Sequence, residues 1–335
     1  MVIRKTTFPM IDSIASLTRR GFIQLGGAAY LGLNLGGLWR AQAAAGAEAT
    51  GVKPIRACIL LFYYGGPSHI DTVDPKPNAP AEVRGAFQPI STAVPGLQIS
   101  EHLPRLARVM DKVALVRSVY HSAQLHDAAS IHALTGRPLE GPDRELFAPL
   151  PQFYPSFGSA VAYMRRAVAC DVPFASLPYV FNNVVPTPCQ GAGILGTAYD
   201  PLRIDVDPIQ KIYPVEALRP REGMCRGRLE QRRGLLEMLN GSMRVANPLS
   251  KFHDKAFHLL ESESIRTALD ITQEPPAVRD RYGFGTAVET KGEVNGGQLG
   301  FAREMRGQNL LLARRLVEAG VPFVNVYDCK QQGQN

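Results

Sequence analysis

Hydrophobic and polar positions divide the chain into apolar runs of strand length and segments with helical spacing. Residues 57–64 form an uninterrupted apolar run bounded by an arginine and two glycines, which is typical of a strand buried on both faces of a parallel sheet. Residues 101–112 place four apolar side chains on one helical face, with Ser100 as N-cap, and residues 113–119 predict a second strand. This order predicts an α/β protein with a doubly wound, mostly parallel sheet flanked by helices.

The middle of the chain has fewer regular patterns. Residues 126–134 predict a short helix that ends at Gly136 and Pro138. Residues 149–220 are rich in Gly and Pro and contain only short apolar runs. We therefore expect irregular structure there that partly covers the sheet.

Helical periodicity returns in the C-terminal third, before one last strand. The predicted elements are helices over residues 226–260, 265–272 and 308–319, a Gly-rich flexible connection over 283–297, and a strand over 321–327. Gly320 fits the C′ position after the last helix. Because a strand is normally placed by the element that follows it, we expect a sheet that is incomplete at the C-terminus.

The N-terminus has the features of an export signal. Arg19 and Arg20 precede an apolar, Gly-rich run over residues 21–38, and small residues follow it. The pattern is typical of a twin-arginine signal over residues 1–45, so we expect the twin-arginine export machinery as a partner and a periplasmic or extracellular location. A transmembrane helix is the alternative. Asn34 and the glycines would make it insert weakly, so we expect no stable membrane span in the mature chain.

Charge and cysteine content exclude two classes of function. Removal of residues 1–45 lowers the formal net charge from +7 to +3, because that segment carries five basic residues and one acidic residue. The chain has no basic stripe with interleaved aromatics, so we expect no nucleic acid as a partner. Its five cysteines show no CxxC spacing and form no zinc signature. We expect Cys58 to be a buried thiol, and a disulfide between Cys170 and Cys189 stays open.

The first candidate site follows the first predicted strand. The sequence GGPSHIDTVD at residues 65–74 offers His69, Asp71 and Asp74 at the carboxyl end of that strand, where ligands bind in open α/β sheets. One imidazole and two carboxylates would suit a divalent cation. An Asx-type turn with solvated acids is the alternative.

The second candidate site lies in the segment HSAQLHDAASIHALTGR at residues 121–137. His126, next to Asp127, comes near the end of the second predicted strand and is the better candidate for a ligand or a base. We interpret His121 and His132 as packing or surface residues. Arg137 follows the helix and could hold an anion or a carboxylate. The chain contains no GxSxG, P-loop or GxGxxG site in a suitable context.

Several blocks carry a family resemblance. The stretch from Cys58 to Val119, followed by LTGRP, resembles the bacterial exported proteins grouped as domain of unknown function 1501. The later blocks PSFGSAVAY, GAGILGTAYDP, VRDRYG and GQNLLLARRLVEAGVPFVNVYD are similar to the same family. The resemblance implies the alkaline-phosphatase-like or sulfatase superfamily, with divalent metals at the strand ends. Residues 46–335 would then be the N-terminal part of such a domain.

Sulfatases offer a second comparison. LPRLA at residues 103–107 and LTGR at residues 134–137 match two of their sequence anchors. Counting back from Gly136 places the sulfatase nucleophile at His126, where no Cys or Ser is present. The sulfatase nucleophile is therefore absent.

The resemblance also implies a site and a function. His69, Asp71 and His126 would bind a divalent metal (Zn, Ca, Mg or Mn), His126 would be ligand or base, and Arg137 would clamp the anion. The parent protein would be an exported, metal-dependent hydrolase of sulfate or phosphate esters. Because the family continues with further ligands, we expect weak metal binding and no activity from this chain alone. A secreted, non-catalytic binding or scaffold protein is the alternative.

Overall fold

The computed structural model describes residues 55–64, 66–178, 180–204, 213, 226–242, 250–284 and 300–328. Nearly all of them belong to one compact unit, residues 57–335. The predicted export signal and most of the predicted Gly-rich connection lie outside the described residues. Within the described residues, none of the helices has both the length and the apolar character needed to cross a membrane.

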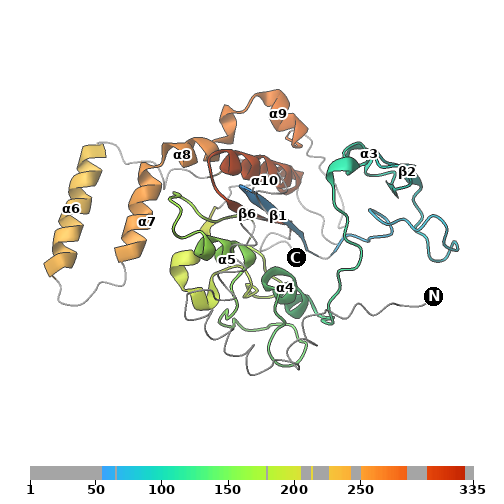
Figure 1. Cartoon of the computed structure of the whole chain (residues 1–335), viewed down its shortest axis with the longest axis horizontal. Coiled ribbons are helices and arrows are strands. Elements are labelled where there is room, and N and C mark those ends of the chain that lie inside the picture. Colours follow the sequence, from blue (N-terminus) through green and yellow to red (C-terminus); the bar gives the residue numbers. More distant parts are fainter. Residues whose placement is uncertain are drawn as a thin grey trace, which may run out of the picture. The chain divides into compact units, whose positions relative to one another are not determined.

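A parallel sheet forms the centre of the unit (Figure 1). It contains β1 (Cys58–Tyr63), β6 (Phe323–Asp328), β4 (Ala175–Leu177) and β5 (Leu202–Arg203), in the order β1-β6-β4-β5, and each of these neighbouring pairs is parallel. A separate antiparallel pair joins β2 (Pro89–Ser91) to β3 (Gln98–Ser100). The expectation of an α/β protein with a mostly parallel sheet is confirmed.

Helices make up most of the remaining regular structure. They are α3 (Pro104–Ala107), α4 (His126–Thr135), α5 (Phe157–Met164), α6 (Arg226–Ser242), α7 (Ser250–Glu261), α8 (Glu263–Leu269), α9 (Pro276–Arg281) and α10 (Gly300–Glu318). Short 3-10 helices lie at Met110–Lys112, Gly193–Leu195, Thr197–Tyr199 and Ile271–Gln273. Helices are thus present at 126–134, 226–242, 250–260, 265–269 and 308–318, as predicted, and residue 262 separates α7 from α8, whereas residues 243–249 lie outside the described residues.

Strand β6 is buried on both faces and explains how helices cover the sheet. Val324 and Val326 pack with residues of α8 and α10, whereas Tyr327 packs with residues of α4. Phe323 packs against α5. This alternation has the period of two that a strand requires. Gly320, with φ of 97°, ends the preceding helix in the left-handed conformation expected at C′.

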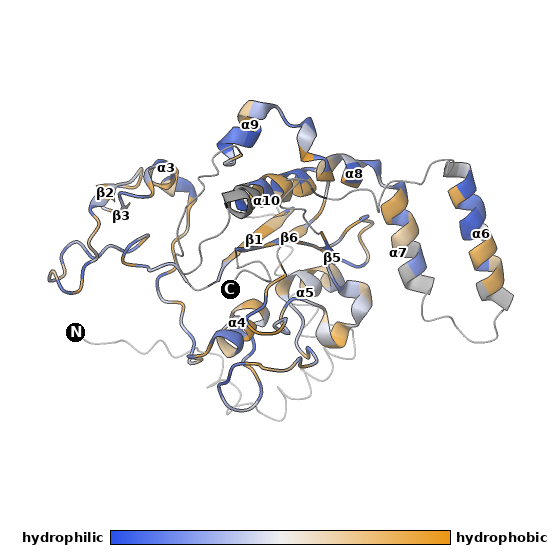
Figure 2. Cartoon of the chain, turned by 180° about the vertical axis from the view of Figure 1, so that it is seen from behind, coloured by the Kyte–Doolittle hydropathy of each residue, from blue (hydrophilic) through white to orange (hydrophobic). Residues whose placement is uncertain are grey.

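Strand β1 is less buried than its apolar run predicts. It is coloured as hydrophobic in Figure 2, yet it lies at one end of the described strand order. Ile59 and Tyr63 are 41% and 49% exposed. Cys58 is exposed, so the prediction that it is a buried thiol is wrong. Cys170 and Cys189 are free thiols and form no disulfide with each other. Within the described residues, β1 has a neighbouring strand, β6, on one side only. A strand at the end of a sheet is less buried than a central one.

The second predicted strand is absent. Residues 113–119 form no strand, and Val116 and Val119 are 64% and 79% exposed. An apolar run forms a strand only where another strand offers hydrogen bonds to its backbone. Within the described residues, no strand pairs with residues 113–119. The helix predicted at 101–112 is shorter than expected. Helix α3 begins after Leu103, which makes no side-chain capping hydrogen bond. Ser100, the predicted N-cap, belongs to β3 instead.

The segment at 149–220 is more regular than predicted. It contributes α5 and two of the four strands of the parallel sheet, β4 and β5. Ser156 is the N-cap of α5, and its Oγ accepts from the backbone N–H of Ser159 at 3.3 Å. Strands of two and three residues are too short for a recognisable alternation, so the sequence pattern could not reveal them.

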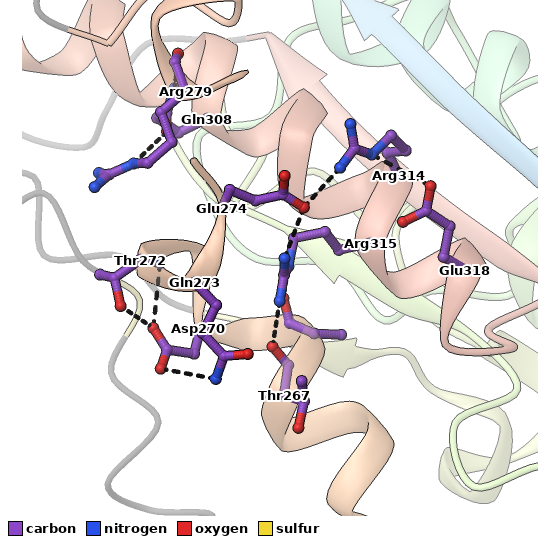
Figure 3. A network of polar contacts seen from close by, with 11 residues as sticks. Thr267, Asp270, Thr272, Gln273, Glu274, Arg279, Gln308, Arg314, Arg315 and Glu318 are labelled. Atoms are coloured by element: carbon purple, nitrogen blue, oxygen red, sulfur yellow. Dashed lines mark hydrogen bonds and ion pairs between the residues drawn. The ribbon is translucent and has the colours of Figure 1, made fainter. Parts of the chain in front are cut away.

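A polar network joins α10 to α8 and the turn after it (Figure 3). Glu274 accepts hydrogen bonds from Arg314 at 2.6 Å and Arg315 at 2.7 Å. Arg315 also donates to the backbone oxygens of Thr267 and Ala268. Burial by itself would raise the pKa of Glu274, but the hydrogen bonds from Arg315 and Arg314 hold it below its ordinary value.

Replacing Glu274 by Gln is expected to remove the pH dependence that this network gives to folding. Because the pKa of Glu274 is lowered in the folded protein, its stabilising contribution is complete above the ordinary pKa and is lost as the pH falls through the lowered one. The variant should lose about 2 kcal/mol at neutral pH. Urea unfolding between about pH 3 and pH 7 measures this. An unchanged acid slope in the variant would contradict it.

Candidate functional site

Strands β1 and β6 end side by side at the carboxyl edge of the sheet. Tyr63 pairs with Asp328, and the backbone N–H of Tyr64 donates to the backbone oxygen of Asp328 at 3.1 Å. A cavity of about 100 Å³ lies between these strand ends and α10. Its polar lining includes Tyr63, Arg306, Asn309 and Asp328. Ligands of open α/β proteins bind at this edge, so the cavity lies where a binding site is expected.

Two of the lining residues form an ion pair. Nε of Arg306 lies 2.6 Å from Oδ1 of Asp328, and the two side chains are 35% and 21% exposed. Burial raises the pKa of Asp328, and the neighbouring Arg306 offsets only part of this effect. Burial also raises the pKa of the Tyr63 phenol, and the charge of Asp328 adds to it. The cavity therefore offers a guanidinium, a protonated phenol and a carboxyl group whose pKa is raised.

His126 lies at the same end of β1 but on the side of α4. Tyr63 lines the cavity beside α10, whereas Tyr64 packs with the cluster that includes α4 residues. The rings of Tyr64 and His126 have centroids 5.6 Å apart. His126 is exposed and is the first residue of α4, so its imidazole is accessible to a ligand.

The N-terminus of α4 is capped by a residue distant in sequence. Leu125 precedes the helix and has no capping side chain. The Glu145 carboxylate instead accepts from the backbone N–H of His126 at 3.0 Å and of Asp127 at 3.2 Å. A carboxylate at this end is favoured by both the free N–H groups and the helix dipole. Glu145 thus fixes where His126 lies.

Asp127 holds the same helix end to two loops. Its carboxylate is completely buried and accepts from Leu146 N at 2.8 Å, Thr187 Oγ at 2.7 Å and Asn183 Nδ2 at 3.3 Å. The Asn183 amide also accepts from the Tyr64 hydroxyl at 3.2 Å. With three donors and no access to solvent, Asp127 is a positioning residue and not a reacting one.

The loop after β1 is a folded turn rather than a cluster of free ligands. The backbone oxygen of His69 accepts from Asp74 N at 2.7 Å, and His69 itself is exposed. Asp74 is buried and forms ion pairs with Lys76 and with Arg117, the latter at 3.3 Å. The hydrogen bond from Lys76 holds the pKa of Asp74 below its ordinary value. Asp74 is therefore engaged in neutralising cations of its own chain.

The predicted metal ligands do not form a ready metal centre. His69, Asp71 and His126 have suitable donor atoms, but within the described residues no group of three or more His, Cys, Asp or Glu side chains could hold a metal ion. A site with fewer ligands binds metal weakly. His69, Asp71 and His126 are therefore not brought together into such a group within the described residues.

The two predicted catalytic residues lie at opposite ends of one helix. His126 begins α4, and Arg137 follows its C-cap, Gly136, whose φ of 70° is left-handed. A helix of this length separates them by roughly 15 Å, too far to contact one small substrate group together. Arg137 is exposed. The rings of His121 and His132 lie 5.9 Å apart, in agreement with a packing role for that pair.

Sequence reasoning missed Arg306 and Asp328. Asp328 directly follows the apolar core of the last strand, so the rule that selected His69 and Asp71 would also have selected it. Arg306 has no such signal, because its position depends on how α10 packs against β1 and β6. Glu145 and Asn183 come from irregular loops and could not be predicted either.

A parallel sheet flanked by helices defines an α/β protein, and its carboxyl edge, where the polar groups lie, is the candidate site. A family model described as "Protein of unknown function (DUF1501)" matches residues 55–330, and the chain therefore belongs to the DUF1501 family. The family resemblance seen in the sequence is confirmed. No curated protein and no solved structure matches the chain.

Proposed function

We propose that the protein is an exported hydrolase of sulfate or phosphate esters with an alkaline-phosphatase-like fold. One observation carries the proposal: a guanidinium, a phenol and a carboxyl group, from Arg306, Tyr63 and Asp328, line a cavity where β1 and β6 end side by side. A guanidinium and a phenol donate hydrogen bonds that stabilise the charge of an ester anion, and a carboxyl group does so only when it is protonated. The proposed export depends on the signal-like pattern at residues 1–45.

Each group has a separate role in this proposal. Arg306 binds the anionic oxygens of the ester, because a guanidinium donates in a fixed planar geometry. Tyr63, which keeps its proton, donates a further hydrogen bond. His126, which lies beside Tyr64 at the same end of β1, accepts a proton from the attacking water as the S–O or P–O ester bond breaks, and the released alkoxide takes a proton from solvent. Arg137 has no part in it, because of its distance from His126.

The proposal is tested by assaying the full protein against aryl sulfates and phosphate mono- and diesters, with Mn, Zn, Ca or Mg added in turn. His126→Ala and Arg306→Gln should each lower kcat by about 100-fold or more. His102→Ala is the control, because His102 is exposed and packs on Phe87 next to β3. Absence of turnover with every metal and every ester would sink the proposal.

A secreted binding or scaffold protein is the second candidate. It is favoured by the Arg306–Asp328 ion pair, in which the two charges already neutralise each other, and by the absence of the sulfatase nucleophile at His126. Calorimetric titration with divalent metals discriminates the two functions. Heat of metal binding together with turnover supports the hydrolase. Absence of both supports the scaffold.

A further inference from the structure

We infer that the cavity between β1, β6 and α10 is a binding site for a tetrahedral oxyanion, which takes Arg306 from Asp328 while Asp328 takes up a proton. The inference deepens the proposed function, since it names the group by which the substrate is held. It stands on binding alone, so a protein that hydrolyses nothing can still confirm it.

The size and walls of the cavity suit one small anion. Its volume of about 100 Å³ exceeds the roughly 10–15 Å³ that one water molecule needs, so it has room for a small group. Leu61, Leu310 and Val326 form apolar walls, and the polar groups converge from both strands and the helix. A concave, partly apolar space with a few convergent polar groups is the usual form of a small-molecule site.

The charges in the cavity explain why an anion would enter it. With Asp328 ionised, the Arg306–Asp328 pair is neutral and an incoming anion meets a carboxylate. With Asp328 protonated, Arg306 is a partly buried cation without its counter-ion. Such a charge attracts an anion strongly, because the pair interaction is less screened than at the surface.

Asp328 is prepared for this exchange by its surroundings. Burial raises its pKa, and an anion bound to Arg306 would remove the opposing influence of the guanidinium and raise it further. The other titratable groups that line the cavity, within the described residues, are Tyr63 of β1, Tyr327 of β6 and Arg306 of α10. The pKa of Tyr63 is raised too, so its phenol stays a donor. Anion binding should therefore strengthen as the pH falls.

Sulfate is the decisive probe, because its charge does not change over the pH range of the measurement. Calorimetric titration of the full protein should give a lower Kd at about pH 5 than at about pH 8, by up to about tenfold for each unit by which binding raises the pKa of Asp328. Asp328→Asn should bind sulfate with the same affinity at both pH values. That affinity should be at least as high as the affinity of the unsubstituted protein at about pH 5. Arg306→Gln should weaken binding at least about tenfold at both.

The control is Arg233→Gln, which removes the same charge from an exposed pair with Glu237 on α6. It should bind sulfate as the parent protein does. Thermal melts establish that each variant folds. If Arg306→Gln does not fold, Tyr63→Phe replaces it, with an expected loss of about threefold to tenfold. Methyl sulfate and methyl phosphate, titrated beside sulfate and phosphate, distinguish an ester group from a free inorganic anion as the ligand.

Three results would overturn the inference. The first is that the unsubstituted protein binds no sulfate at either pH. The second is that sulfate affinity still depends on pH in Asp328→Asn. The third is that Arg306→Gln binds sulfate as tightly as the Arg233→Gln control. A turnover assay on the same preparations separates this outcome from failure of the proposed function, because hydrolysis and sulfate affinity are measured independently.

Discussion

Replacing Gly307 by alanine is expected to destabilise the protein by at least about 3 kcal/mol, although alanine is the better helix former. Gly307 lies in α10 where this helix passes the turn after α9, and an added Cβ would overlap the backbone oxygen of Tyr282. The neighbouring Gln308 side chain donates to the backbone oxygens of Arg279 and Tyr282 at 3.1 and 3.2 Å. These bonds hold the turn against the helix, so it cannot yield without losing them.

The matched control is Gly234→Ala in α6. A Cβ there meets nothing within 4 Å, so the same substitution should stabilise by up to about 1 kcal/mol through helix propensity alone. Urea unfolding followed by circular dichroism measures both changes from the transition midpoint at constant slope. The two variants must move in opposite directions. Equal shifts of the same sign would mean that α10 does not approach the turn closely.

The elements that sequence patterns predicted well are those whose own residues decide their conformation. The helix at α4 ends at a left-handed glycine, and α10 is followed by another before an apolar strand begins. Such signals are local: helical spacing, a C′ glycine and a continuous apolar run. They were sufficient for β6 and for the existence of β1. They could not tell that β1 has a described neighbour on one side only.

The elements that were predicted wrongly depend on pairing at long range. Val116 lies in a largely apolar run, as Leu60 does, but only Leu60 lies in a strand that pairs with another. Strand β4, with three residues, exists because β6 and β5 lie on either side of it. The local sequence pattern predicts neither pairing, because strand pairing depends on which strands meet after folding.

The candidate site shows the same division. His126 was found because it follows an apolar run and begins a predicted helix, and both features are local. The groups that position it, Glu145 and Asn183, reach the helix from 19 and 56 residues further along the chain. Asp328 could have been chosen from its place after a strand. Its partner Arg306 could not, since that contact depends on the packing of α10 on β1 and β6.

Replacing Asp127 by alanine is expected to cost about 4 kcal/mol, because it leaves buried donors without a partner. The carboxylate accepts from Leu146 N, Thr187 Oγ and Asn183 Nδ2, and its residue is completely buried. No water can replace the lost acceptor unless the loops open. Thermal and urea unfolding of the variant measure the loss, which should appear as a lower midpoint with an unchanged slope.

Two further variants decide whether hydrogen bonding, and not volume, accounts for the loss of stability in Asp127→Ala. Asp127→Asn keeps the shape and one acceptor oxygen but turns an NH₂ group toward donors, so it should lose about 2 kcal/mol. Asp143→Ala removes an exposed carboxylate that accepts from Gln124 N at 2.6 Å and should cost less than about 1 kcal/mol. A loss for Asp127→Ala no larger than for Asp143→Ala would contradict the buried network. The position of His126 beside Tyr64 would then need another cause, because Asn183 links Tyr64 to Asp127.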